Sequence, residues 1–126
     1  MNRFRLAGRI IGRFILVQRL LRAQPLPAVV DTLALRPPLA NPKDVRRLRY
    51  GVDRLLDRRG RPFRCLPRAL VLYSLLVDQG ENPRLLIGLP MESAGTEAHA
   101  WVEVAGRDVG PNPGRGSHEP MASYPL

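Results

Sequence analysis

An apolar stretch near the middle of this 126-residue chain constrains its fold more than any other feature. Residues 69–77 read Ala-Leu-Val-Leu-Tyr-Ser-Leu-Leu-Val, which is apolar on nearly every side of a helix. A helix of that kind has to be buried in the core. Pro67 suits a first helical turn and Gly80 suits a C-cap, so the sequence predicts a buried helix over residues 65–79.

A second pattern, after that helix, is typical of a sheet. Residues 98–105 alternate, with apolar side chains on one face and His99, Trp101 and Glu103 on the other. Residues 83–89 form a shorter strand candidate, and residues 105–106 make a tight turn into residues 107–110. The sequence therefore predicts an antiparallel sheet that covers one side of the buried helix, with the histidine face of its strand able to point at the thiol of the cysteine that begins that helix.

Helices are predicted before the buried helix. Residues 4–23 form an amphipathic pattern with arginines opposite the apolar face. We interpret this segment as a helix packed on the domain or on a partner, with a membrane-surface helix as the alternative. A short helix is expected over residues 28–35 and another over residues 42–58, where Asn41 and Pro42 suit an N-terminus. The expected fold class is α+β, papain- or transglutaminase-like, with N-terminal helices and a buried Cys-bearing helix packed on a small antiparallel sheet.

The chain is long enough for one core, so a single domain over residues 1–126 is expected. We divide it into an N-terminal helical extension (1–40), a core carrying the candidate site (41–110) and a C-terminal tail (111–126). The tail is rich in Pro, Gly and Ser and is expected to be irregular, with His118 exposed to solvent.

Cysteine and histidine counts limit the chemistry. One cysteine allows no intrachain disulfide and suits a reducing compartment. Two histidines and one cysteine give no metal-binding pattern, so no metal or other cofactor is expected. The longest apolar run near the N-terminus has four residues, too few for a signal peptide or a membrane span. We therefore expect a cytoplasmic protein.

The charge is strongly basic and unevenly spread. The formal net charge is +9, and residues 1–68 carry 17 Arg and Lys against 4 Asp and Glu. An acidic peptide or protein partner, or a membrane surface, would suit this basic N-terminal half of the chain. Nucleic acid is not expected, because the basic half has few aromatic residues and no nucleic-acid motif.

Cys65 and His99 are the candidate catalytic pair. Cys65 lies at the start of the buried helix, where partial positive charge and free N–H groups favour the nucleophilic thiolate. A lone cysteine on a helix followed by a lone histidine on a strand is typical of papain- or transglutaminase-type thiol sites. The alternatives are a small buried hydrophobe for Cys65 and a hydrogen-bonded sheet histidine for His99.

A thiol site also needs a group that orients the imidazole. Asp108 is the first choice, because one hairpin turn brings it back toward His99. Asn112 is the competing choice, since an amide can also orient the ring. Glu103 ranks third, because it lies roughly 13 Å along the strand from His99.

Two segments carry a resemblance to a known family. They are Cys65-Leu66-Pro67-Arg68-Ala69-Leu70 and Ala98-His99-Ala100-Trp101-Val102-Glu103-Val104. Together they resemble the transglutaminase-like domain of lasso peptide biosynthesis, the microcin-processing B protein C-terminal-domain family. The resemblance covers about residues 45–112.

The resemblance implies a cysteine endopeptidase that removes the leader from a ribosomally made precursor, before a separate cyclase closes the macrolactam. It implies a triad of Cys65, His99 and Asp108, although the family's Asp often lies nearer the position of Asn112. It also implies a split form, in which a separate small protein binds the leader. The alternative functions are a transglutaminase-like acyl transferase or deamidase, and a non-catalytic binding module.

Overall fold

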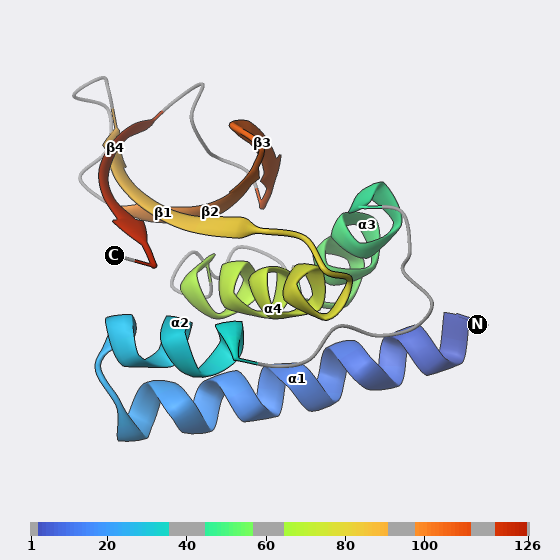
Figure 1. Ribbon diagram of the computed structural model, residues 1–126. Helices are drawn as coiled ribbons and strands as arrows, with labels where there is room; N and C mark the ends of the chain where they lie inside the picture. Colours follow the sequence, from blue (N-terminus) through green and yellow to red (C-terminus); the bar gives the residue numbers. More distant parts are fainter. Residues whose placement is uncertain (1–2, 36–44, 57–64, 91–97, 112–117, 126) are drawn as a thin grey trace.

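The apolar stretch forms α4 (Cys65–Asp78), which lies between the sheet and the helices of residues 3–34 (Figure 1). The computed structural model describes residues 3–35, 45–56, 65–90, 98–111 and 118–125. Within these residues there are four helices and one four-stranded antiparallel sheet, which confirms the α+β class. Residues 69–76 of α4 are all buried, as predicted.

The end of α4 follows the expected glycine cap. Gly80 has a φ of 82°, in the left-handed region that glycine adopts without strain. Its N–H bonds to the Val77 carbonyl at 2.9 Å, and the N–H of Glu81 bonds to the Leu76 carbonyl at 3.1 Å. This pair of bonds is a Schellman motif, and it turns the chain from α4 into the sheet.

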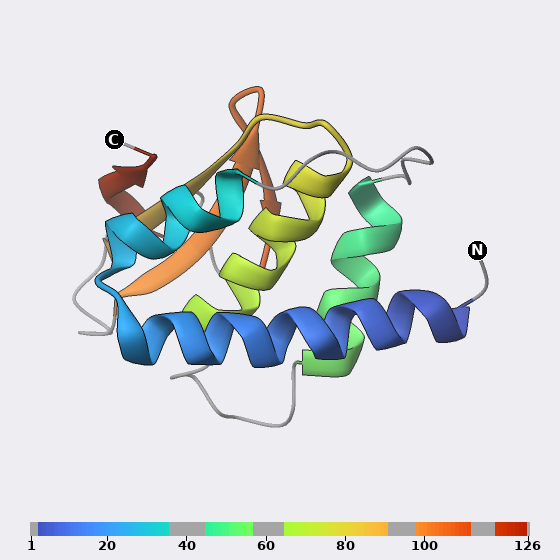
Figure 2. The ribbon, with the colours of Figure 1, turned by 60° about the horizontal axis from the view of Figure 1, so that its bottom comes forward.

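The long N-terminal helix α1 (Arg3–Ala23) crosses α4 on the side away from the sheet (Figures 1 and 2). Its Leu6, Ile10 and Val17 belong to the same buried core as α4. The interpretation of residues 4–23 as a helix packed on the domain is therefore confirmed, and this part of the predicted extension is built into the core.

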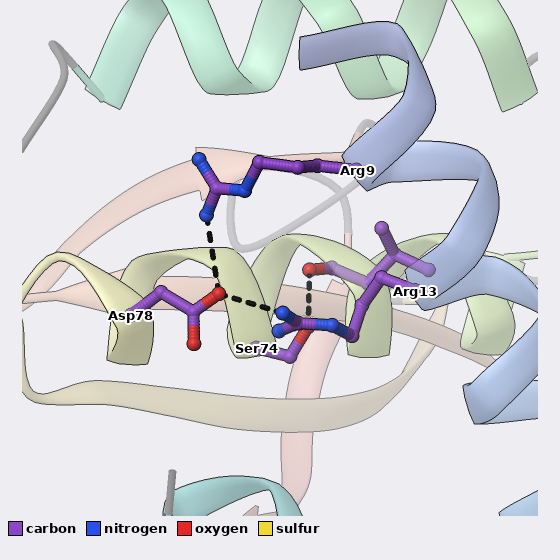
Figure 3. A network of polar contacts seen from close by, with 5 residues as sticks. Arg9, Arg13, Ser74 and Asp78 are labelled. Carbon is purple, nitrogen blue, oxygen red and sulfur yellow. Dashed lines mark hydrogen bonds and ion pairs between the residues drawn. The ribbon is translucent and has the colours of Figure 1, made fainter. Parts of the chain in front are cut away.

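Two arginines of α1 lie inside the fold (Figure 3). Arg9 and Arg13 each contact Oδ2 of Asp78, at 3.1 and 2.7 Å, and the Asp78 side chain is 4% exposed. Arg13 also donates to the hydroxyl of Ser74 at 3.0 Å. The acid at the end of α4 draws both guanidinium groups inward, so the arginines of α1 do not all face solvent.

Two further helices flank α4. The first, α2 (Leu26–Ala34), begins after Pro25, and buries Val29, Val30 and Leu33. The second, α3 (Val45–Leu56), buries Leu48 and Val52. Both match predicted helices within a few residues, while the proposed N-cap at Asn41 lies outside the described residues.

The sheet has the order β3-β2-β1-β4. Its strands are β1 (Pro83–Pro90), β2 (His99–Val104), β3 (Arg107–Gly110) and β4 (His118–Tyr124). Figure 1 shows that the sheet curves, with its convex face on the helices and its concave face turned away from them. On the helix side, Leu85, Ala100 and Val102 join the main core.

The strand β4 overturns the expectation that residues 111–126 form an irregular tail. Residues 118–124 pair with β1, with a shift in register between Ile87 and Gly88. Proline and a short polar sequence gave β4 little strand character of its own. Pro120 is tolerated because β4 is an edge strand with an irregular register, where a missing N–H can be accommodated. Pairing with β1, not local propensity, makes this segment a strand.

Candidate active site

Cys65 is the first residue of α4, as the sequence predicted. The first turn of α4 and the start of β2 lie at the same end of the molecule in both ribbon views (Figures 1 and 2). Pro67, in that first turn, is buried. The side chain of Cys65 lies outside the described part of the chain, so the structure gives the position of its backbone within the fold and no contact of its thiol.

His99 is the first residue of β2 and is half-buried. It pairs with Gly88 of β1. Because Ala100 and Val102 face α4, the alternation of the strand puts His99 on the concave face. The histidine face of β2 is therefore the one turned away from the middle of α4. The helix-facing side is the small apolar one, which lets α4 pack closely.

The concave face carries a largely buried group of residues of its own, which we call the concave-face cluster. It consists of Leu86, Gly88, His99, Trp101, Glu103 and His118. Trp101 is fully buried, and its Nε1 donates to Oε2 of Glu103 at 2.9 Å. Glu103 is 6% exposed, so the indole supplies a donor to a carboxyl that is largely removed from water.

Gly88 lets this cluster form. A Cβ added at Gly88 would lie 2.8 Å from the far edge of the Trp101 ring and 2.6 Å from the Glu119 carbonyl oxygen. The indole of Trp101 therefore lies over the backbone of β1 at the position where a side chain is missing. Glycine is required here by close approach.

His118 is the unexpected member of the cluster. It is 6% exposed, and its ring centroid lies 4.6 Å from that of His99, with an interplanar angle of 76°. The expectation that His118 is a solvated tail residue is wrong. The sequence contained one hint, since His99 and His118 are the chain's two histidines. The register of β4, which brings them together, could not be read from the sequence.

Asp108, the predicted orienting residue, lies on β3 opposite Glu103. Its Oδ1 accepts a hydrogen bond of 2.8 Å from the backbone N–H of Gly110. Glu103 is four residues beyond His99 on β2, so Asp108 lies roughly 13 Å along the strand from the level of His99. The structure thus brings His99 together with His118, whereas Asp108 pairs with Glu103 further along the sheet. Asn112 lies outside the described residues.

A family model identifies the family to which this fold belongs. A comparison with protein-family models matches residues 4–123 to the transglutaminase-like superfamily. The chain belongs to the transglutaminase-like superfamily. A comparison with curated proteins and one with solved structures found no match.

The family match extends beyond the part of this transglutaminase-like domain in which the sequence resemblance lies. The match covers nearly all of α1 and of β4, which is wider than the range of about residues 45–112 that the sequence resemblance covers. Proteins of the transglutaminase-like superfamily are typically cysteine proteases or acyl transferases, so a thiol-dependent reaction is the chemistry that this family supports.

The described residues contain no group of three or more His, Cys, Asp or Glu side chains that could hold a metal ion. None of the helices that the structure describes is both long enough and apolar enough to cross a membrane.

Proposed function

We propose that this transglutaminase-like protein is a cysteine endopeptidase that removes the leader from a lasso peptide precursor. The observation that carries the proposal is the placement of Cys65 at the start of α4, at the end of the molecule where β2 begins with His99. The two residues lie in the Cys-Leu-Pro-Arg-Ala-Leu and Ala-His-Ala-Trp-Val-Glu segments that resemble the lasso peptide family.

The proposed reaction uses these two groups in sequence. The Cys65 thiolate attacks the scissile carbonyl and forms a thioester with the leader, and the His99 imidazolium gives its proton to the leaving amine of the core peptide. Water then attacks the thioester, with His99 taking a proton from it, and the leader leaves with a free carboxylate. The free amine of the core is the group that a separate macrolactam cyclase joins to a side-chain carboxyl.

Asp108 or Asn112 is proposed to orient His99 in this reaction. Asp108 lies opposite Glu103, so it would have to act on His99 from the other end of the concave-face cluster. Asn112 follows β3 in the sequence. Comparing Asp108→Asn with Asn112→Ala tests the two assignments. The substitution that lowers kcat while leaving KM unchanged identifies the orienting group, because orientation of the base matters in the transition state.

The experiment that tests the function uses the full chain, its precursor peptide and the separate leader-recognition protein. Cys65→Ala and His99→Gln are expected to abolish leader removal, followed by mass spectrometry, while circular dichroism shows a retained fold. Arg54→Gln, at an exposed position of α3, is the control and is expected to cleave normally. Full cleavage by Cys65→Ala would refute the proposal.

The product mass separates hydrolysis from acyl transfer. Hydrolysis leaves a leader with a free carboxylate, whereas acyl transfer to an added amine leaves an amide of different mass. Since Cys65 is the chain's one cysteine, iodoacetamide labelling reports on it alone. Labelling near neutral pH is expected to be faster than that of an ordinary thiol, and slow labelling would favour a non-catalytic binding module.

The basic outer face of α1 is proposed to contact the leader-recognition protein or the precursor. Arg19 and Arg22 are exposed there, whereas Arg9 and Arg13 bind Asp78 inside the fold. Deleting α1 would remove core residues, so charge reversal is the sharper test. Arg19→Glu together with Arg22→Glu should weaken retention of the partner in a pull-down, and unchanged retention would exclude this face.

A further inference from the structure

We propose that His118 is a positioning residue for His99. The inference rests on the proposed function, because it assigns His118 a role only if His99 acts as the base of a thiol site. Its structural part, the contact between the two rings, stands on the geometry of the sheet alone.

The two histidines reach one another across β1. His99 is on β2 and His118 is on β4, and β1 lies between these strands. Neighbouring strands are about 4.8 Å apart, so the two backbones are separated by about twice that distance. His99 pairs with Gly88, which has no side chain to stand between the rings.

The ring geometry is one that holds an imidazole in place. A centroid distance of 4.6 Å and an interplanar angle of 76° describe an edge-to-face contact, which aromatic rings prefer to direct stacking. The last torsion of a histidine side chain has a broad energy profile, so its ring plane is set by its neighbours. His118 is 6% exposed and is itself held by burial, so it can fix the plane of the half-buried His99.

A fixed ring plane matters because the imidazole must meet both the thiol and the leaving amine in the proposed reaction. Asp108 lies opposite Glu103 and is occupied with the N–H of Gly110. His118 would hold the His99 ring whichever of Asp108 and Asn112 binds its nitrogen. This role needs the flat shape of the His118 ring and not its nitrogen atoms.

Two substitutions separate the shape of the ring from its chemistry. His118→Ala removes the ring, and His118→Phe keeps a flat ring of similar size. With the precursor and the leader-recognition protein present, His118→Ala should lower kcat by about tenfold or more at unchanged KM, because a misaligned base loses part of its catalytic contribution. His118→Phe should recover most of the lost rate. Wild-type kcat in His118→Ala, or equal losses in both variants, would overturn the proposal.

A measurement without substrate keeps the test independent of the proposed function. The chain's two histidines give a simple imidazole region in NMR spectra. The wild type should show nuclear Overhauser effects between the two rings, and His118→Phe should show them between the phenyl ring and His99. Their absence in the folded wild type would overturn the proposal even if cleavage is normal. If they are present while Cys65→Ala still cleaves the precursor, the proposed function fails and the positioning role fails with it.

Discussion

The indole Nε1 of Trp101 donates a 2.9 Å hydrogen bond to Oε2 of Glu103, two residues further along the same face of β2. Both side chains are buried in the concave-face cluster, so the bond is made away from bulk water. The Ala-His-Ala-Trp-Val-Glu segment thus places three polar or aromatic side chains on one face of the sheet, where Trp101 and Glu103 satisfy each other and His99 meets His118.

Removing the acceptor at position 103 should destabilise the fold. Glu103→Ala leaves the buried indole N–H without this partner, and we expect a loss of about 1–3 kcal/mol in the free energy of unfolding. Glu103→Gln keeps an acceptor oxygen and should lose less. Urea unfolding followed by the fluorescence of Trp101, the chain's one tryptophan, measures both variants. Equal stability of Glu103→Ala and the wild type would contradict the importance of this bond.

The ion pairs of Arg9 and Arg13 with Asp78 should contribute strongly to the packing of α1 against α4. Asp78→Asn removes the charge that faces Arg9 and Arg13, and we expect a loss of about 3 kcal/mol, since breaking a buried ion pair leaves uncompensated charge. Asp31→Asn, at an exposed position of α2, is the matched control and should change stability by less than about 0.5 kcal/mol. Urea unfolding at neutral pH measures both variants. Similar losses in the free energy of unfolding would show that the burial of Asp78 does not matter.

Two glycines should respond to alanine with opposite signs. At Gly88 an added Cβ would lie 2.6 Å from a backbone oxygen, and we expect Gly88→Ala to lose about 1–3 kcal/mol through overpacking. At Gly12, exposed on α1, no atom lies within 4 Å of such a Cβ, and Gly12→Ala should gain about 0.5–1 kcal/mol through helix propensity. Thermal unfolding of both variants is the measurement, and a stabilised Gly88→Ala variant would refute the close approach at β1.

Tyr73 should make the fold sensitive to alkaline pH. Burial, and then the Asp31 carboxylate, raise the pKa of Tyr73 above its ordinary value of 10.0, with Arg84 acting in the opposite direction. The unfolded chain therefore loses this proton at a lower pH than the folded chain. The contribution of the Tyr73 phenol to the free energy of unfolding is fully present below about pH 10 and is lost as the pH rises above that value.

The measurement is urea unfolding of the wild type and of Tyr73→Phe at pH 8 and at several values above pH 10. The wild type should lose stability more steeply over this interval than Tyr73→Phe, which has no phenolic proton. Asp31→Asn removes the second cause of the raised pKa and should keep most of the slope. Identical slopes in the wild type and in Tyr73→Phe would show that the phenol of Tyr73 titrates as it does in the unfolded chain.

Much of the fold could be predicted because its signals are local. The apolar stretch before Gly80 gave α4 and its cap, and the alternation around Trp101 gave β2. The strand β4 had no such signal, since Pro120 and its polar neighbours gain their strand conformation by pairing with β1. The inward turn of Arg9 and Arg13 was hidden for a related reason, because it depends on an acid that lies more than sixty residues away.

The candidate site was predicted in part. The sequence placed Cys65 at a helix start and His99 at a strand start, and both positions are confirmed. The face on which His99 lies could not be predicted, because alternation assigns residues to two faces without saying which one the helix covers. The neighbour of His99 was missed, because His118 reaches it only through the register of β4.

The order of the strands also bears on how easily the sheet could aggregate through its edges. The edges of the sheet are β3, which has four residues, and β4, which contains Pro120 and pairs with β1 through a shifted register. A short strand and a strand interrupted by proline are poor templates for the addition of another chain. The sheet is therefore protected from edge-to-edge aggregation on both sides, and a substitution such as Pro120→Val should make concentrated solutions more prone to it.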